Sequence, residues 1–175
     1  MRRRELSAAL AIAATLGPLA AGATTLPSAL LTSLPLLKRW GTGEFRRFGF
    51  YVYEATLWAG DSDSAQPPLA LSLTYKRTIK GQAIAEASVD QMRRFGASEA
   101  DLARWLTQMQ AVFPNVKEGD QIVGVHLPDK AVFYFNGQPA GEVASADFAR
   151  HFFAIWLDPR TSEPKLRTAL LKRPA

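Results

Sequence analysis

The chain of 175 residues contains no cysteine, two histidines and two asparagines. The absence of cysteine excludes disulfide scaffolds, thiolate metal sites and cysteine nucleophiles. The histidines, His126 and His151, cannot by themselves form a three-histidine zinc site. A composition that is 47% hydrophobic is too apolar for an intrinsically disordered protein, and the length suits one folded domain rather than two large ones.

The first 23 residues have the three parts of a secretory signal peptide. Three arginines, at positions 2 to 4, precede an apolar stretch over 6–20 and the small residues Ala21-Gly22-Ala23. The pattern predicts export to the periplasm with cleavage after Ala23, because the apolar stretch is short for a membrane span of about 20 residues. Removing this segment lowers the formal net charge from +5 to +3. So small a charge, without a basic and aromatic stripe, argues against a nucleic-acid partner.

The remaining chain predicts one α+β domain over 36–175. Residues 24–35 contain Pro27 and Pro35, and we expect them to form an extended lead-in without a helix. Period-two patterns predict strands, and period-3.6 patterns with caps at Ser98 and Ser145 predict helices. The expected strands cover 36–58, 69–77, 121–127, 130–135 and 141–143, and the expected helices cover 84–95, 98–113, 145–156 and 163–171. Strands joined by hairpin turns, without βαβ alternation, predict helices packed on an antiparallel sheet.

Four stretches, in this order and spacing, resemble the bacterial exported branch of the chalcone isomerase-like proteins. They are GTGEFRRFGFYVYEATLWAG (41–60), FPNVKEGDQI (113–122), FYFNGQPAGEV (133–143) and FARHFFAIWLDPRTSEPKLRTALL (148–171). The resemblance implies an open-faced β-sandwich, in which a layer of helices covers a large antiparallel sheet. It also implies one of two functions: closure of chalcones to flavanones, or non-catalytic binding of fatty acids between the sheet and the helices.

The enzymes of the family need an arginine and a set of hydroxyl and amide groups to hold the reacting oxygens. Their arginine follows a glycine pair, but here Phe45 takes that place after Gly41 and Gly43. The arginines come one and two positions later, and a shift by one reverses a strand side chain unless a bulge intervenes. Tyr53 replaces the family's threonine on the next strand.

The other groups of the enzymes have no counterpart in this sequence. Gln82, Ala83 and Ile84 stand where the family has a tyrosine and an asparagine, and the last hydroxyl falls near Ala154 and Ile155. One or two of five groups remain, so the resemblance does not carry isomerase activity to this chain.

Four residues are candidates for binding a ligand: Arg46, Arg47, Tyr53 and Tyr75. A guanidinium can hold both oxygens of a carboxylate, and a tyrosine hydroxyl can add a hydrogen bond. Strict alternation would place Arg47 with Tyr51 and Tyr53, and Arg46 with Phe48 and Phe50. The alternatives are a solvated strand end for the arginines and structural hydrogen bonds for the tyrosines.

The sequence context of the other polar residues indicates structural roles. His126 and Asp120 suggest a dyad, but no serine stands in a nucleophile-elbow pattern. His151 is expected at a helix interface. Asp61 and Asp63 indicate a turn, because no glycine and glutamate complete a metal loop. We therefore expect neither a metal nor a cofactor.

Three functions follow from the sequence. The first is a monomeric, non-catalytic periplasmic protein that binds a hydrophobic carboxylate such as a fatty acid, or a flavonoid-like molecule. The alternative is an intramolecular lyase or isomerase acting on an enone or phenolic substrate. The third is a structural or partner-binding module of the cell envelope. A peripheral contact with an acidic membrane surface stays open, although the aromatic stretch 148–156 is expected to lie in the core.

Overall fold

The computed structural model describes residues 25–174, so the predicted signal peptide and its cleavage site lie outside the described residues. Within them, six strands form one antiparallel sheet in the order β1-β2-β3-β4-β5-β6. Each strand therefore pairs with its neighbours in sequence. The strands are β1 (Lys38–Arg47), β2 (Phe50–Ala59), β3 (Leu69–Tyr75), β4 (Gln121–His126), β5 (Ala131–Phe135) and β6 (Gln138–Val143).

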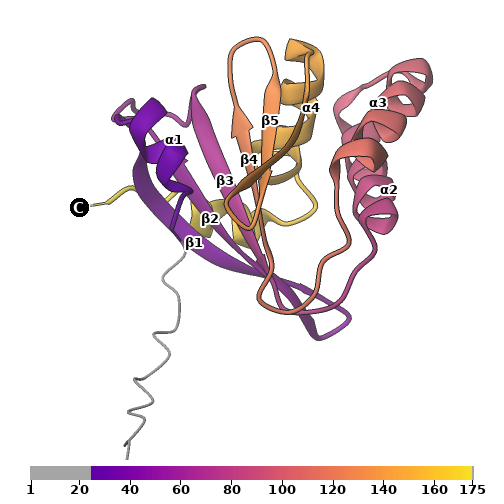
Figure 1. Cartoon of the computed structure of the whole chain (residues 1–175), viewed down its shortest axis with the longest axis horizontal. Coiled ribbons are helices and arrows are strands. Elements are labelled where there is room, and N and C mark those ends of the chain that lie inside the picture. Colours follow the sequence, from indigo (N-terminus) through magenta and orange to yellow (C-terminus); the bar gives the residue numbers. More distant parts are fainter. Residues whose placement is uncertain (1–24, 175) are drawn as a thin grey trace, which may run out of the picture.

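The helices lie on both faces of this sheet, mostly on one (Figure 1). They are α1 (Ser28–Ser33), α2 (Gly81–Met92), a 3₁₀ turn η1 (Arg93–Phe95), α3 (Glu99–Val112), α4 (Ala146–Leu157) and α5 (Pro164–Leu170). Ser98 and Ser145 cap α3 and α4 through their hydroxyl oxygens, as the sequence predicts. None of the helices in residues 25–174 is both long and apolar enough to cross a bilayer.

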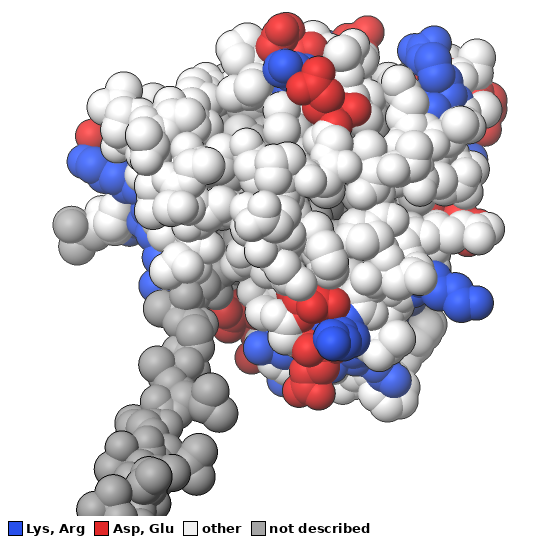
Figure 2. Space-filling model, viewed as in Figure 1, with Lys and Arg blue, Asp and Glu red and all other residues white. Residues whose placement is uncertain are grey.

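Two apolar clusters hold the layers together. The larger lies between the sheet and the helices that follow β3, with Trp105, Phe133, Phe148 and Phe153 fully buried. The smaller joins α1 to the opposite face of the sheet, where Leu26, Leu30 and Leu37 pack on Ala70, Val123 and Val125. The face of the molecule that includes α1 is uncharged over its centre (Figure 2). The predicted α+β fold is confirmed.

The expected extended lead-in over 24–35 is wrong, because α1 forms within it. Pro27 is tolerated because it stands at the N-cap, where a missing N–H breaks no helical hydrogen bond, and its carbonyl accepts from the N–H groups of Leu30 and Leu31. Leu30 is then buried on the sheet. Six residues would not form a stable helix alone, so this packing supplies the stability that local propensity lacks.

A β-bulge near the end of the first hairpin changes which side chains face the helices. Phe45 pairs with Tyr53, but Arg46 pairs with Tyr51, so Val52 is an extra residue on β2. Beyond the bulge the alternation of β2 is reversed. The predicted grouping of Arg47 with Tyr51 is therefore wrong: Tyr51 lies with Arg46 on the face away from the cavity described below.

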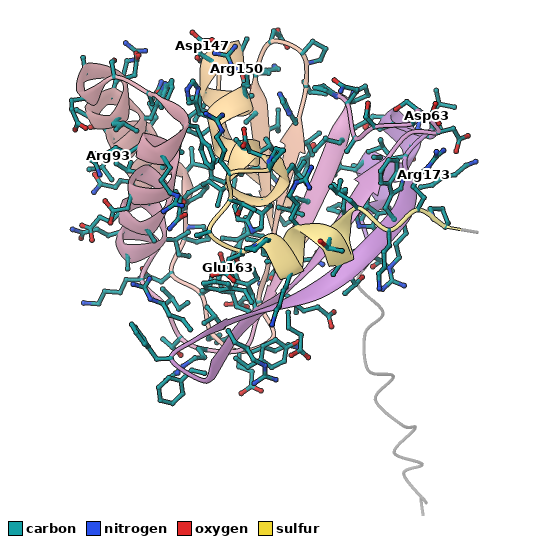
Figure 3. The ribbon with its side chains drawn as sticks, turned by 180° about the vertical axis from the view of Figure 1, so that it is seen from behind. Asp63, Arg93, Asp147, Arg150, Glu163 and Arg173 are labelled. Carbon is teal, nitrogen blue, oxygen red and sulfur yellow. The ribbon has the colours of Figure 1, made fainter. Side chains whose placement is uncertain are left out.

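Helix α5 crosses β1 at very close range (Figure 3). Gly41 is buried, and a Cβ atom built on it would collide with the carbonyl oxygen of Ala169. A Cβ atom on Gly43 would come within 2.7 Å of Leu166 Cδ1. The two glycines therefore let the last helix lie directly on the edge strand.

Candidate functional site

A cavity of about 910 Å³ lies between the sheet and the helices α2 and α4. Its sheet side is lined by Leu71, Leu73, Ile122, Gly124 and Phe133. Its helix side is lined by Ala83, Ile84 and Ala87 of α2 and by Phe152, Phe153, Ile155 and Trp156 of α4. Small-molecule sites range from about 300 to 1,000 Å³ and are mostly apolar with few polar groups. The cavity fits that description in size and in lining.

Exposed side chains among the lining residues mark the mouth of the cavity. Two of them are basic, Arg47 and Arg77, and two are aromatic, Phe48 and Phe50. The guanidinium of Arg77 lies 4.3 Å from the centre of the Phe50 ring. Acidic lining residues, Glu86, Asp90 and Glu163, come from α2 and from the start of α5, where Figure 3 labels Glu163. The mouth therefore has charges of both signs on different walls.

Tyr53 contributes a polar group to the apolar cavity. Its hydroxyl accepts a hydrogen bond of 3.0 Å from the indole N–H of Trp156, and its ring stacks on Phe45 with centroids 4.9 Å apart. Burial raises the pKa of Tyr53 far above its usual value, so the phenol keeps its proton. Because the oxygen already accepts from Trp156, the hydroxyl proton is left to donate to another acceptor.

Tyr75 lies opposite Tyr53 in the β2–β3 pairing, with ring centroids 5.9 Å apart. The residue is 2% exposed, and burial raises its pKa. Its side chain lines the cavity, and none of the hydrogen bonds within residues 25–174 uses its hydroxyl. Its oxygen is not among the fully buried polar atoms without a partner in residues 25–174, so the hydroxyl opens onto the cavity and can donate to a ligand there.

The two neighbouring arginines have different surroundings. Arg46 forms an ion pair of 2.9 Å with Glu44 and stacks on Tyr51, away from the cavity. Arg47 lines the cavity and lies over the ring of Phe48. It stands two residues beyond Phe45 on β1, about 7 Å along the strand from the Tyr53 pairing. Of the four candidate residues, the structure brings Arg47, Tyr53 and Tyr75 to one cavity and separates Arg46 from them.

The histidines lie apart from this group. The ring of His126 stacks on Phe153 at 4.9 Å, and burial lowers its pKa to about 4. Asp120 caps a loop at the other end of β4, where its carboxylate accepts from Lys117 N–H and Asn136 Nδ2. His151 bonds through Nδ1 to the carbonyl of Asp147. The structure therefore does not bring His126 and Asp120 together as a dyad.

The acidic turn after β2 is occupied by ion pairs. Asp61 pairs with Lys38 at 2.8 Å, and Asp63 pairs with Arg173 at 3.1 Å (Figure 3). In the part of the chain that the structure describes, no three histidine, aspartate or glutamate side chains converge on a point that could hold a metal ion.

Two residues of the site were not identified from the sequence. Trp156 was expected in a buried helix face, but its indole N–H also fixes the hydroxyl of Tyr53. Arg77 is not among the four candidate residues. The alternation of β3 indicates which face of the sheet Tyr75 lies on. No local signal in the sequence shows that the loop after β3, which contains Arg77, lies at the mouth of the cavity.

An antiparallel sheet, a layer of helices on one of its faces and an apolar cavity between them define an open-faced α+β domain. The chain belongs to the chalcone isomerase-like family, whose model matches residues 33–172. The resemblance noted in the sequence is therefore confirmed, and with it the fold that the resemblance implies.

Two relatives show how far the likeness extends. Over 133 residues the chain is 30% identical to an uncharacterized protein of Haemophilus influenzae, covering 75% of this chain and 66% of that protein, just under two thirds of its length. Among solved structures, it is similar to a fatty-acid binding protein of Arabidopsis thaliana, with a TM-score of 0.59 and 14% identity over 78% of this chain and 87% of the other. At that identity, the likeness shows a common fold alone.

Proposed function

We propose that this protein binds a hydrophobic carboxylic acid, such as a fatty acid, in the cavity between the sheet and the helices, without chemical turnover. The observation that carries the proposal is the combination of a mostly apolar space of about 910 Å³ with hydrogen-bond donors on its wall, among them Arg47, Tyr53 and Tyr75. Two protonated tyrosine hydroxyls and one guanidinium can all donate to a carboxylate, and the apolar walls match an acyl chain. The Arabidopsis relative is named a fatty-acid binding protein, which supports this choice of ligand.

The isomerase alternative has less support from the lining of the cavity. Ala83 and Ile84, which stand where the family's enzymes have a tyrosine and an asparagine, line the cavity with apolar groups. They offer no hydrogen bond to a developing enolate. Turnover of a panel of enone substrates by the purified protein would reverse this preference.

Arg47 and Arg46 provide a matched pair for testing the ligand site. Palmitate is titrated into delipidated protein, into Arg47→Gln and into Arg46→Gln, with binding followed by calorimetry. We expect Arg47→Gln to weaken binding about tenfold or more, because a hydrogen bond between charged groups contributes about 1.5–3 kcal/mol. Arg46→Gln should change the affinity less than about twofold, since Arg46 points away from the cavity. An equal loss in both variants, or no binding of palmitate at all, contradicts the proposal.

The periplasmic location is part of the proposal and is supported by the arginines, the apolar stretch and the small residues of positions 1–23. Cell fractionation and N-terminal sequencing of the protein from its own cells test it. The expected mature protein begins at Thr24. A cytoplasmic protein that retains residues 1–23 would overturn this part. Native mass spectrometry of the same sample identifies the bound cargo.

A further inference from the structure

The tip of the β1–β2 hairpin exposes two large aromatic side chains to solvent. Phe48 is 87% exposed and Phe50 is 58% exposed. The tip lies at the lower end of the molecule in Figure 1, at the same end as the loops between β3 and α2 and between α3 and β4. Side chains of this kind are usually buried, so an exposed pair at one tip indicates a contact surface.

Comparison with a second hairpin of the same chain shows that Phe48 is not the residue type that the backbone of the β1–β2 turn favours. Asn136-Gly137, between β5 and β6, has φ angles of 47° and 82°, and Phe48-Gly49 has φ angles of 50° and 81°. Asparagine is favoured at the first of these positions, where a positive φ strains most other residues. Asn136 also accepts from Gln121 N–H and donates to Asp120. Phe48 has both a strained positive φ and an exposed apolar side chain, and the guanidinium of Arg47 lies 5.4 Å from the centre of its ring.

Basic side chains surround the aromatic tip. The segments 44–54 and 75–80 contain five basic residues, Arg46, Arg47, Lys76, Arg77 and Lys80, and two acidic ones, Glu44 and Glu54. No acidic residue lies between positions 45 and 53 or between 75 and 80. Acidic side chains do occur elsewhere at this end of the molecule (Figure 2), and Lys117 and Glu118 of the adjacent loop cancel each other in charge. The apex itself is therefore cationic.

We propose that this tip, residues Arg46–Phe50 with Lys76 and Arg77, docks on an anionic lipid surface. Phe48 and Phe50 enter the interfacial layer, while the arginines and Lys76 bind lipid phosphates. Arg47, Phe48, Phe50 and Arg77 also form the basic and aromatic wall of the cavity mouth, so docking brings that wall against the lipid, and not the acidic wall of Glu86, Asp90 and Glu163. A lipid-derived acid can then pass between the bilayer and the cavity without crossing water. This transfer rests on the proposed function, whereas the docking does not.

The test is co-sedimentation with vesicles of phosphatidylcholine and phosphatidylglycerol, compared with vesicles of phosphatidylcholine alone. All variants keep the N-terminus of the wild type, so any contribution of residues 1–24 is common to them. We expect wild-type protein to bind the anionic vesicles, and salt to weaken the binding. Phe48→Asn should reduce the partition coefficient about tenfold or more, as expected for a lost apolar side chain. Arg46→Gln should reduce it about fivefold.

The control variant is Leu36→Ser. Leu36 is 80% exposed but precedes the opposite end of β1, so its replacement should change binding less than about twofold. Urea unfolding separates a structural effect from a lipid effect, because Phe48→Asn should keep or raise the unfolding midpoint.

Absence of vesicle binding by the wild type, or equal binding by wild type and Phe48→Asn, overturns the docking proposal. Calorimetry with palmitate on the same wild-type sample keeps the two proposals apart. Palmitate binding without vesicle binding contradicts only the docking, and the reverse result contradicts only the ligand site.

Discussion

Two tyrosines on neighbouring strands face one cavity but have opposite roles in the stability of the protein. The hydroxyl of Tyr53 accepts the buried N–H of Trp156. The hydroxyl of Tyr75 opens onto the cavity, without a hydrogen bond to another of residues 25–174. A buried polar group that loses its partner costs about 1–3 kcal/mol, whereas removing an unpartnered group costs little.

Replacement of each tyrosine by phenylalanine therefore separates structure from binding. Tyr53→Phe should lower the free energy of unfolding by about 1–2 kcal/mol, because Trp156 is left without an acceptor. Tyr75→Phe should leave it unchanged within about 0.5 kcal/mol or raise it slightly. Urea unfolding of the ligand-free proteins measures both.

The effect of Tyr75→Phe on ligand binding should differ from its effect on stability. Under the proposed function, Tyr75→Phe removes a hydrogen-bond donor to the ligand carboxylate, and we expect it to weaken palmitate binding about five- to tenfold. A Tyr75→Phe protein that is clearly destabilised, yet binds palmitate as the wild type does, would show that the hydroxyl is structural.

At the scale of the element, the position of α5 depends on the absence of a side chain on β1. Gly41→Ala brings a methyl group against the carbonyl oxygen of Ala169, and neither backbone can move without disturbing the sheet or the helix. We expect the free energy of unfolding to fall by about 1–3 kcal/mol or more. Gly60→Ala is the control, because a Cβ atom there meets nothing within 4 Å. Urea unfolding should show a change within about 0.5 kcal/mol for Gly60→Ala, and equal losses would contradict the close-approach argument.

The elements that the sequence predicts best are those with a long, unbroken period. Helices α3 and α4 carry apolar stripes and serine caps, so their existence and starts could be read directly. Helix α1 could not, because its stability comes from Leu30 packing on strands that follow much later in the chain. The bulge at Val52 also leaves no local signal, since both faces of β2 are apolar near it. For this reason the sequence could place Arg46 and Arg47 at a strand end but could not assign their faces.

At the scale of the whole molecule, an occupied cavity should stabilise both layers at once. A ligand at one hundred times its Kd adds about 2.7 kcal/mol to the stability of the folded state. For a chain of 175 residues, this corresponds to a rise in Tm of about 5–10 °C with palmitate. Hexadecanol, which has the same tail but no carboxylate, should give a smaller rise, because Arg47 gains no ionic partner. Equal rises for both compounds would show that the headgroup is not recognised.

The sheet is a simple meander, with a long detour from β3 to β4 through α2 and α3. The detour is closed at its base by paired hydrogen bonds of 2.9 Å between Ile79 and Val116 and by Asn115, which accepts from Gly81 N–H at 3.0 Å. The hydrogen bonds that pair the strands of the sheet do not involve these two helices. One wall of the cavity is thus a pair of helices that is anchored at its base. Mutations in this pair can change the shape of the cavity, and with it the proposed ligand preference, while every strand keeps its hydrogen-bonded partners.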